Sequence, residues 1–282
     1  MVRISADSTC DLSKELIEKY DITITPLYVR VGEEERLDGV NVSPDDIFAH
    51  FDSTGKLCTT AALSISDYAE HFKRLTAGGD SVVHVSISAE FSSCYQNACA
   101  AAEDFTNVYV VDSCNLSTGH GHIVIEAALM AQQGLDAATI KERCDELAPR
   151  VDASFVLEHL NYLYKGGRCS GVAALGANIL GIKPCIEVKD GKMVVGSKYR
   201  GSFEKVVKAY IRERLTARDD IIYDRIFITH TKCPEGIVDV ARKCIEECGI
   251  FNEIIDTMAG CTVSSHCGPH CLGVLYIHKN KK

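Results

Sequence analysis

Ser92, Ser93 and Cys94 form a polar turn between a short apolar segment, residues 81–87, and a helix-forming segment that ends near Asp104. The apolar segment is typical of a buried strand, so the turn stands where a strand leads into a helix. Hydroxyl groups and free backbone N–H groups at a helix N-terminus attract anions. The turn could therefore hold a carboxylate or a phosphate, or Ser92 could simply cap the helix.

His266 lies in a second polar run, which precedes the last apolar segment, residues 273–278. We expect this run to be a loop at the end of a strand. There His266 could donate to a carboxylate or phosphate, or be an ordinary surface histidine. A metal or redox site is a third alternative, because four ligand-type residues stand close together at spacings that zinc sites allow: His266, Cys267, His270 and Cys271. We assign no metal ligand on this spacing alone.

Catalysis would need further groups around these residues. Ser92, His266 and Asp112 could be combined on paper into a triad that hydrolyses acyl esters. However, the sequence lacks the G-x-S-x-G elbow, and Ser92 and His266 fall in different halves of the chain. It also lacks the P-loop and the G-x-G-x-x-G pattern. We therefore expect no catalytic residue and no cofactor, and keep the hydrolase as an alternative.

The first half of the chain alternates short apolar strands with helices, which favours a parallel α/β sheet. We expect strands at 2–6, 81–87 and 108–111, and helices at 14–20, 44–51, 66–75, 92–104, 117–133 and 138–147. An extended segment at 22–31 should form a small hairpin insertion near 22–40, and residues 59–64 should form a loop. Ligands bind at the carboxyl ends of parallel strands. Three loops should lie there: 7–10, 88–94 and 112–118.

The pattern of expected elements in the second half of the chain predicts an α+β layer. We place the domain boundary near Val151, with domains at 1–151 and 152–282. Asp190-Gly191 between two apolar runs predicts a hairpin. The other expected elements are strands at 155–157, 225–229, 253–256 and 273–278, and helices at 158–164, 173–180, 202–215 and 235–247.

Composition restricts the function classes. The chain has 282 residues, a formal charge of −9 and no apolar run long enough to cross a membrane. The negative charge argues against a generally basic nucleic-acid binder. The N-terminus has no apolar signal region. We expect a cytoplasmic protein whose fourteen cysteines are reduced and act as small hydrophobic side chains.

Seven motifs along nearly the whole chain resemble, in order, those of the DegV family of bacterial fatty-acid-binding proteins. The sequence matches a D-S-T-x-D-L opening at 7–12 and resembles an L-x-x-G-G-R-I-S stretch at 163–170, where Cys169 replaces the isoleucine. It is similar to a T-S-Q-P-S loop at 60–64, an L-S-G-T-Y-Q-S-A stretch at 91–98, an I-K-P strand at 182–184, a K-x-R-G element at 198–201 and an H-x-G-P-G loop at 266–270.

The resemblance implies a Rossmann-like N-terminal domain, a smaller C-terminal α/β domain and a long-chain fatty acid between them. The protein would present this acid to a separate fatty acid kinase, which makes acyl-phosphate for phospholipid synthesis. Thr60, Ser92 and His266 would hold the carboxylate, assisted by the backbone N–H of Ser93 or Cys94. Arg168 and Arg200 would face the domain junction or the kinase.

Three departures from the motifs fall near the implied head-group site. Ser93 and Cys94 replace the glycine and threonine of L-S-G-T, Ala61-Ala62-Leu63 replaces S-Q-P, and His270 replaces the last glycine of H-x-G-P-G. A side chain at position 93 restricts the close backbone approach that glycine allows. For the tail we expect apolar walls that include Ile87, Phe91, Ile123 and Leu175.

Overall fold

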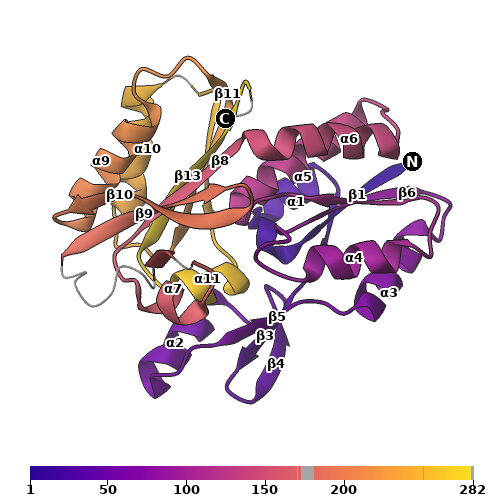
Figure 1. The fold of residues 1–282 in the computed structure, drawn as a ribbon, viewed down its shortest axis with the longest axis horizontal. Helices are drawn as coiled ribbons and strands as arrows, with labels where there is room; N and C mark the ends of the chain where they lie inside the picture. Colours follow the sequence, from indigo (N-terminus) through magenta and orange to yellow (C-terminus); the bar gives the residue numbers. More distant parts are fainter. Residues whose placement is uncertain (170, 173–180, 250, 281–282) are drawn as a thin grey trace.

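Two β-sheets lie side by side in the computed structural model, with a third, small sheet attached below them (Figure 1). The structure describes residues 1–169, 171–172, 181–249 and 251–280. The expected helix at 173–180 lies outside this range.

The first sheet is parallel, as the alternating pattern predicts. Its strands are β1 (Val2–Asp7), β2 (Ile22–Thr25), β6 (Ser81–Ser86) and β7 (Val108–Asp112), in the order β2-β1-β6-β7. Helices α3 (Ile65–Thr76) and α4 (Cys94–Ala102) pack on one face, and α5 (Ser117–Gln132) and α6 (Ala137–Leu147) on the other. The turn η1 (Ser8–Cys10) and α1 (Lys14–Lys19) connect β1 to β2.

The second sheet has six strands in the order β10-β9-β8-β13-β11-β12, and only β11 and β12 pair in parallel. The strands are β8 (Val151–Leu157), β9 (Ile182–Lys189), β10 (Lys192–Arg200), β11 (Ile221–Thr231), β12 (Glu253–Met258) and β13 (Cys271–His278). Helices α9 (Phe203–Leu215) and α10 (Ile237–Cys248) cover one face. The predicted hairpin is present, and Asp190 and Gly191 take the positive φ angles that its turn requires.

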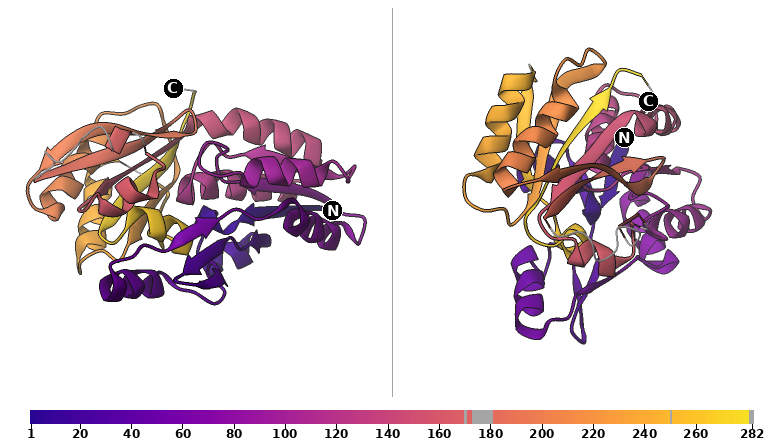
Figure 2. Two further views of the ribbon diagram at one scale, coloured as in Figure 1. Left: turned by 60° about the horizontal axis from the view of Figure 1, so that its bottom comes forward. Right: turned by 60° about the vertical axis from the view of Figure 1, so that its left-hand side comes forward.

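Helix α5 lies between the two large sheets (Figure 2). Its side chains are apolar around most of the helix, which is typical of a buried helix. Ile123 and Val124 belong to one core with Val85 of the first sheet and Leu275 of the second. The core is therefore continuous across Val151, where η2 (Ala148–Arg150) leads into β8.

The region of the small sheet differs from two expectations drawn from the sequence. It contains β3 (Tyr28–Val31), β4 (Glu34–Leu37) and β5 (Thr59–Ala61) in the order β4-β3-β5, beside α2 (Pro44–Thr54). Residues 22–31 are not one extended segment but two strands in different sheets, separated at Pro26. Residues 59–61 are a strand rather than a loop, because they pair with β3 about thirty positions earlier.

Two short helices, α7 (Asn161–Gly166) and α11 (Cys261–Cys267), stand between the small sheet and the large ones (Figure 1). The expectation of a loop around His266 is wrong, since His266 belongs to α11. The Asp38 carboxylate accepts from the N–H groups of Cys261 and Thr262 and caps this helix from more than 200 positions away. Within the described part of the chain, no helix is both long enough and apolar enough to span a bilayer.

Candidate ligand-binding site

A pocket opens where the first sheet, the small sheet and α11 meet. Ile87, Phe91 and Leu116 come from the loops after β6 and β7, so the carboxyl edge of the parallel sheet forms one wall, as expected. The loop after β1 is not part of the wall. The other lining residues are Leu27, Thr60, Ala61, Ala62, Ser92, Arg168, Met193, Thr262, Val263, His266 and Cys267.

Thr60 and His266 meet at the polar end of this pocket. Thr60 Oγ1 lies 2.9 Å from His266 Nε2, which joins β5 to the last turn of α11. The other ring nitrogen, Nδ1, has no hydrogen-bond partner among the described residues. Burial, with a smaller effect from the Arg168 charge, lowers the pKa of His266 to about 4. The imidazole is therefore neutral at pH 7 and carries one N–H.

Ser92 is half-buried and also lines the pocket. Its Oγ accepts from the N–H of Cys94, the first residue of α4, at 3.3 Å, although the N-cap residue is Ser93, whose side chain makes no capping bond. Its hydroxyl donates to Cys94 Sγ at 3.1 Å, and sulfur is a weak acceptor. A carboxylate would be a stronger acceptor for the same hydroxyl proton.

Ser93 and Cys94 are placed differently from Ser92. The Ser93 side chain is exposed and does not line the pocket, and the Cys94 N–H is already bonded to Ser92. Burial raises the pKa of the Cys94 thiol to about 11, so it is a neutral thiol at pH 7 rather than a reactive thiolate.

Thr262 is a pocket residue that the sequence analysis missed. Its side chain is buried, and its Oγ1 has no partner within the described residues. It stands four positions before His266, so both lie on the same face of α11. The i, i+4 spacing would have revealed it only if this run had been identified as a helix.

The two arginines do not share one location. Arg168 is exposed beside the pocket, where its guanidinium donates to Gly166 O. Arg200 is exposed at the end of the edge strand β10 and is not a lining residue.

A second apolar cavity lies next to the first. The two share Leu116, Val263 and Cys267, and the second extends along β8, β11 and β13. Ile87 and Phe91 line the first cavity. Ile123 was predicted as a wall, but it is fully buried in the core around α5. Leu175 lies outside the described residues.

The triad drawn from the sequence is not assembled. The Asp112 carboxylate accepts from the N–H groups of Cys114 and Ala89, and it is not a pocket residue. His266 Nδ1 has no carboxylate partner in the described part of the chain. The pocket therefore lacks the oriented base that serine hydrolysis requires.

The suggested four-residue metal cluster is also not assembled. His266 faces Thr60, whereas His270 Nδ1 donates to Glu158.

Comparisons with known proteins agree over nearly the whole chain. A family model described as "Uncharacterised protein, DegV family" matches residues 1–279. A DegV domain-containing protein of Clostridium perfringens is 33% identical, with 99% of both chains covered. A stearic acid-binding protein from Eubacterium ventriosum has a similar solved structure, with a TM-score of 0.83, 28% identity and 99% of both chains covered.

A DegV family protein from Thermus thermophilus, described for its fatty acid binding, has a TM-score of 0.87 and 26% identity, with 98% of this chain and 99% of that chain covered. The matches span both large sheets and every motif noted in the sequence. The chain belongs to the DegV family.

Proposed function

We propose that this protein binds a long-chain fatty acid in the two neighbouring cavities, with the carboxylate at Thr60, Ser92 and His266. The carrying observation is that Thr60, Ser92 and His266 all line one mostly apolar pocket, in which Thr60 and His266 are hydrogen-bonded to each other. Similar proteins from Eubacterium ventriosum and Thermus thermophilus are described as binding fatty acids, which supports this ligand class.

The tail would supply most of the affinity. Each methylene removed from water contributes about 0.8 kcal/mol, so roughly fifteen contribute about 12 kcal/mol before the entropic cost of association. The tail would pass the shared residues Leu116, Val263 and Cys267 to reach the second cavity.

The head group would be fixed by neutral donors. In the tautomer with a proton on Nε2, His266 donates to Thr60 Oγ1, which leaves the Thr60 hydroxyl proton free for a carboxylate oxygen. Ser92 would donate to the acid in place of its weak bond to Cys94 Sγ. Thr262 Oγ1 offers a further donor. A carboxylate buried without such donors would cost several kcal/mol.

We further propose that the protein is cytoplasmic and presents this carboxylate to a separate fatty acid kinase, which phosphorylates it. The exposed guanidinium of Arg168 stands beside the pocket and could approach phosphate groups of a bound nucleotide. Arg200, on the exposed edge of the second sheet, would contact the kinase more remotely.

Native mass spectrometry with extraction of the ligand tests the binding. We expect a stoichiometric fatty acid on the purified protein, and loss of most of it in a Thr60→Val, Ser92→Ala double variant. The matched control is Thr59→Val, Ser93→Ala, which changes exposed neighbours outside the pocket. A protein that carries no fatty acid and ignores added stearate would refute the proposal.

The hydrolase alternative is tested on the same samples. Because His266 lacks a carboxylate partner, we expect no Ser92-dependent hydrolysis of a p-nitrophenyl ester. Turnover that disappears in Ser92→Ala would instead establish an enzyme.

A further inference from the structure

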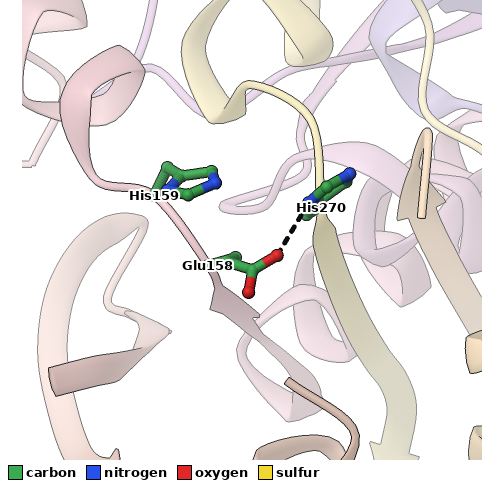
Figure 3. A group of neighbouring side chains, drawn as sticks. All are labelled: Glu158, His159 and His270. Atoms are coloured by element: carbon green, nitrogen blue, oxygen red, sulfur yellow. Dashed lines mark hydrogen bonds and ion pairs between the residues drawn. The ribbon is translucent and has the colours of Figure 1, made fainter. Parts of the chain in front are cut away.

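Outside the pocket, three metal-ligand side chains converge where β8 ends and β13 begins: Glu158, His159 and His270 (Figure 3). One ligand atom from each lies within 4.8 Å of the other two. His270 Nδ1 donates to Glu158 Oε2 at 2.7 Å. The imidazole rings of His159 and His270 face each other with centroids 6.0 Å apart. None of the three lines the pocket.

The backbone holds this group in place from both sides. The N–H of Glu158 donates to His270 O, and the N–H of His270 donates to Thr231 O, so His270 is fixed between two strands. His270 has φ = +59°, in the left-handed region that favours glycine. A non-glycine residue in this conformation is uncommon, and strain of this kind often accompanies a function of the side chain.

The hydrogen bond between Glu158 and His270 does not explain the position of the His159 side chain. The His159 side chain is exposed, yet its ring faces that of His270 instead of extending into solvent (Figure 3). Two imidazoles beside a carboxylate are a ligand set that zinc takes in proteins, with water in the remaining position. Calcium and magnesium prefer sets made of oxygen atoms alone.

We propose that Glu158, His159 and His270 bind a divalent transition-metal ion of the Zn²⁺ class. The ion would displace the proton that His270 now shares with Glu158, and solvent would complete its coordination. The group is only partly buried, so an ion can enter from solvent.

A metal ion at this site would link two segments that lie next to the pocket. Residues 158 and 159 lead into α7, whose Gly166 faces His266, and His270 follows α11, which carries His266 and Thr262. A metal ion would therefore restrain both segments without touching the ligand. This inference does not depend on what the pocket binds.

Zinc uptake by the chelator-treated full chain tests the proposal. We expect one Zn²⁺ per chain by calorimetry, and binding about tenfold or more weaker in His159→Ala and in Glu158→Gln. His159 is exposed, so its removal should leave the fold intact. The control is His50→Ala, a histidine on α2 outside the group, which should bind like the parent protein.

The fourteen thiols require a second readout, because cysteines also bind zinc. We expect bound Co²⁺ to show only the weak absorption of nitrogen and oxygen ligands, without the intense charge-transfer band of thiolate ligands. His270→Gly, which suits the positive φ, should lose the bound Co²⁺ while keeping its thermal stability. A thiolate band, no metal uptake, or unchanged affinity in His159→Ala would overturn the proposal.

Discussion

Gly166 has no side chain, and the His266 ring occupies the space that a side chain at this position would need. A Cβ atom added at Gly166 would lie 2.6 Å from His266 Nδ1, which is closer than real Cβ contacts allow. The end of α7 therefore sets the position of the imidazole whose other nitrogen contacts Thr60. The glycine is needed here for a close approach between two helices.

Gly166→Ala should weaken fatty acid binding by about tenfold, since it displaces the imidazole that orients the Thr60 hydroxyl towards the head group. The loss should appear in isothermal titration with stearate. Gly78→Ala is the control, because its added methyl would meet only the Asp80 carboxylate at 3.9 Å. Equal affinity of both variants would show that the position of His266 does not matter for binding.

Val263→Phe should shorten the tail that the protein accepts, because Val263 lines both cavities and the larger ring would obstruct a tail that reaches the second one. Each methylene kept out of the second cavity costs about 0.8 kcal/mol, or roughly fourfold in Kd. Competition between fatty acids of different length measures the shift, with Val263→Ala as the comparison. The same length preference in both variants would place the tail elsewhere.

Four neutral histidines should make the fold acid-sensitive. Burial lowers the pKa of His71 and His122 to about 3 and those of His120 and His266 to about 4. The unfolded chain takes up these protons near pH 6.5, so the free energy of unfolding should fall as the pH drops from about 6.5 to 4. Urea titrations at several pH values measure it. His122→Gln should reduce the slope and His50→Ala should not.

Asp11 should make the free energy of unfolding fall as the pH rises, which is opposite to the effect of the buried histidines. Burial raises its pKa to about 8, although Ser117 and the Gly260 N–H donate to its carboxyl group. Because the unfolded carboxyl ionises near pH 4, the stabilising contribution is lost as the pH rises towards 8. Above about pH 7.5 the buried histidines are almost entirely neutral in both states, so the remaining loss from Asp11 should be visible there.

Asp11→Asn should therefore remove the decline in unfolding free energy between about pH 7.5 and 8.5. Asp21→Asn is the matched control, because Asp21 has the same φ of 51° but an exposed side chain. If the unfolding free energy of Asp11→Asn falls with pH as steeply as that of the parent protein, another group causes the decline.

The parallel sheet and the pocket edge were predictable because their signals are local. Apolar runs such as 81–86 and 108–112 end in polar turns, and parallel topology brings those turns to one edge. Motifs likewise directed attention to Thr60, Ser92 and His266, all of which line the pocket.

The helix α11 and the strand β5 were not predictable because residues far away in the sequence stabilise them. Asp38 caps α11, and β3 pairs with β5. Missing α11 also concealed Thr262, which faces the pocket only through helical spacing. The convergence of Glu158 with His270 depends on an antiparallel pairing across more than 100 residues, which no local pattern indicates.

A crystal structure of the protein with stearate tests the central claim most directly. The account predicts one stearate per chain, with its carboxylate within hydrogen-bond distance of Thr60 Oγ1 and Ser92 Oγ and its tail passing Val263 into the second cavity. A stearate bound in the reverse direction, or bound outside these two cavities, would contradict it.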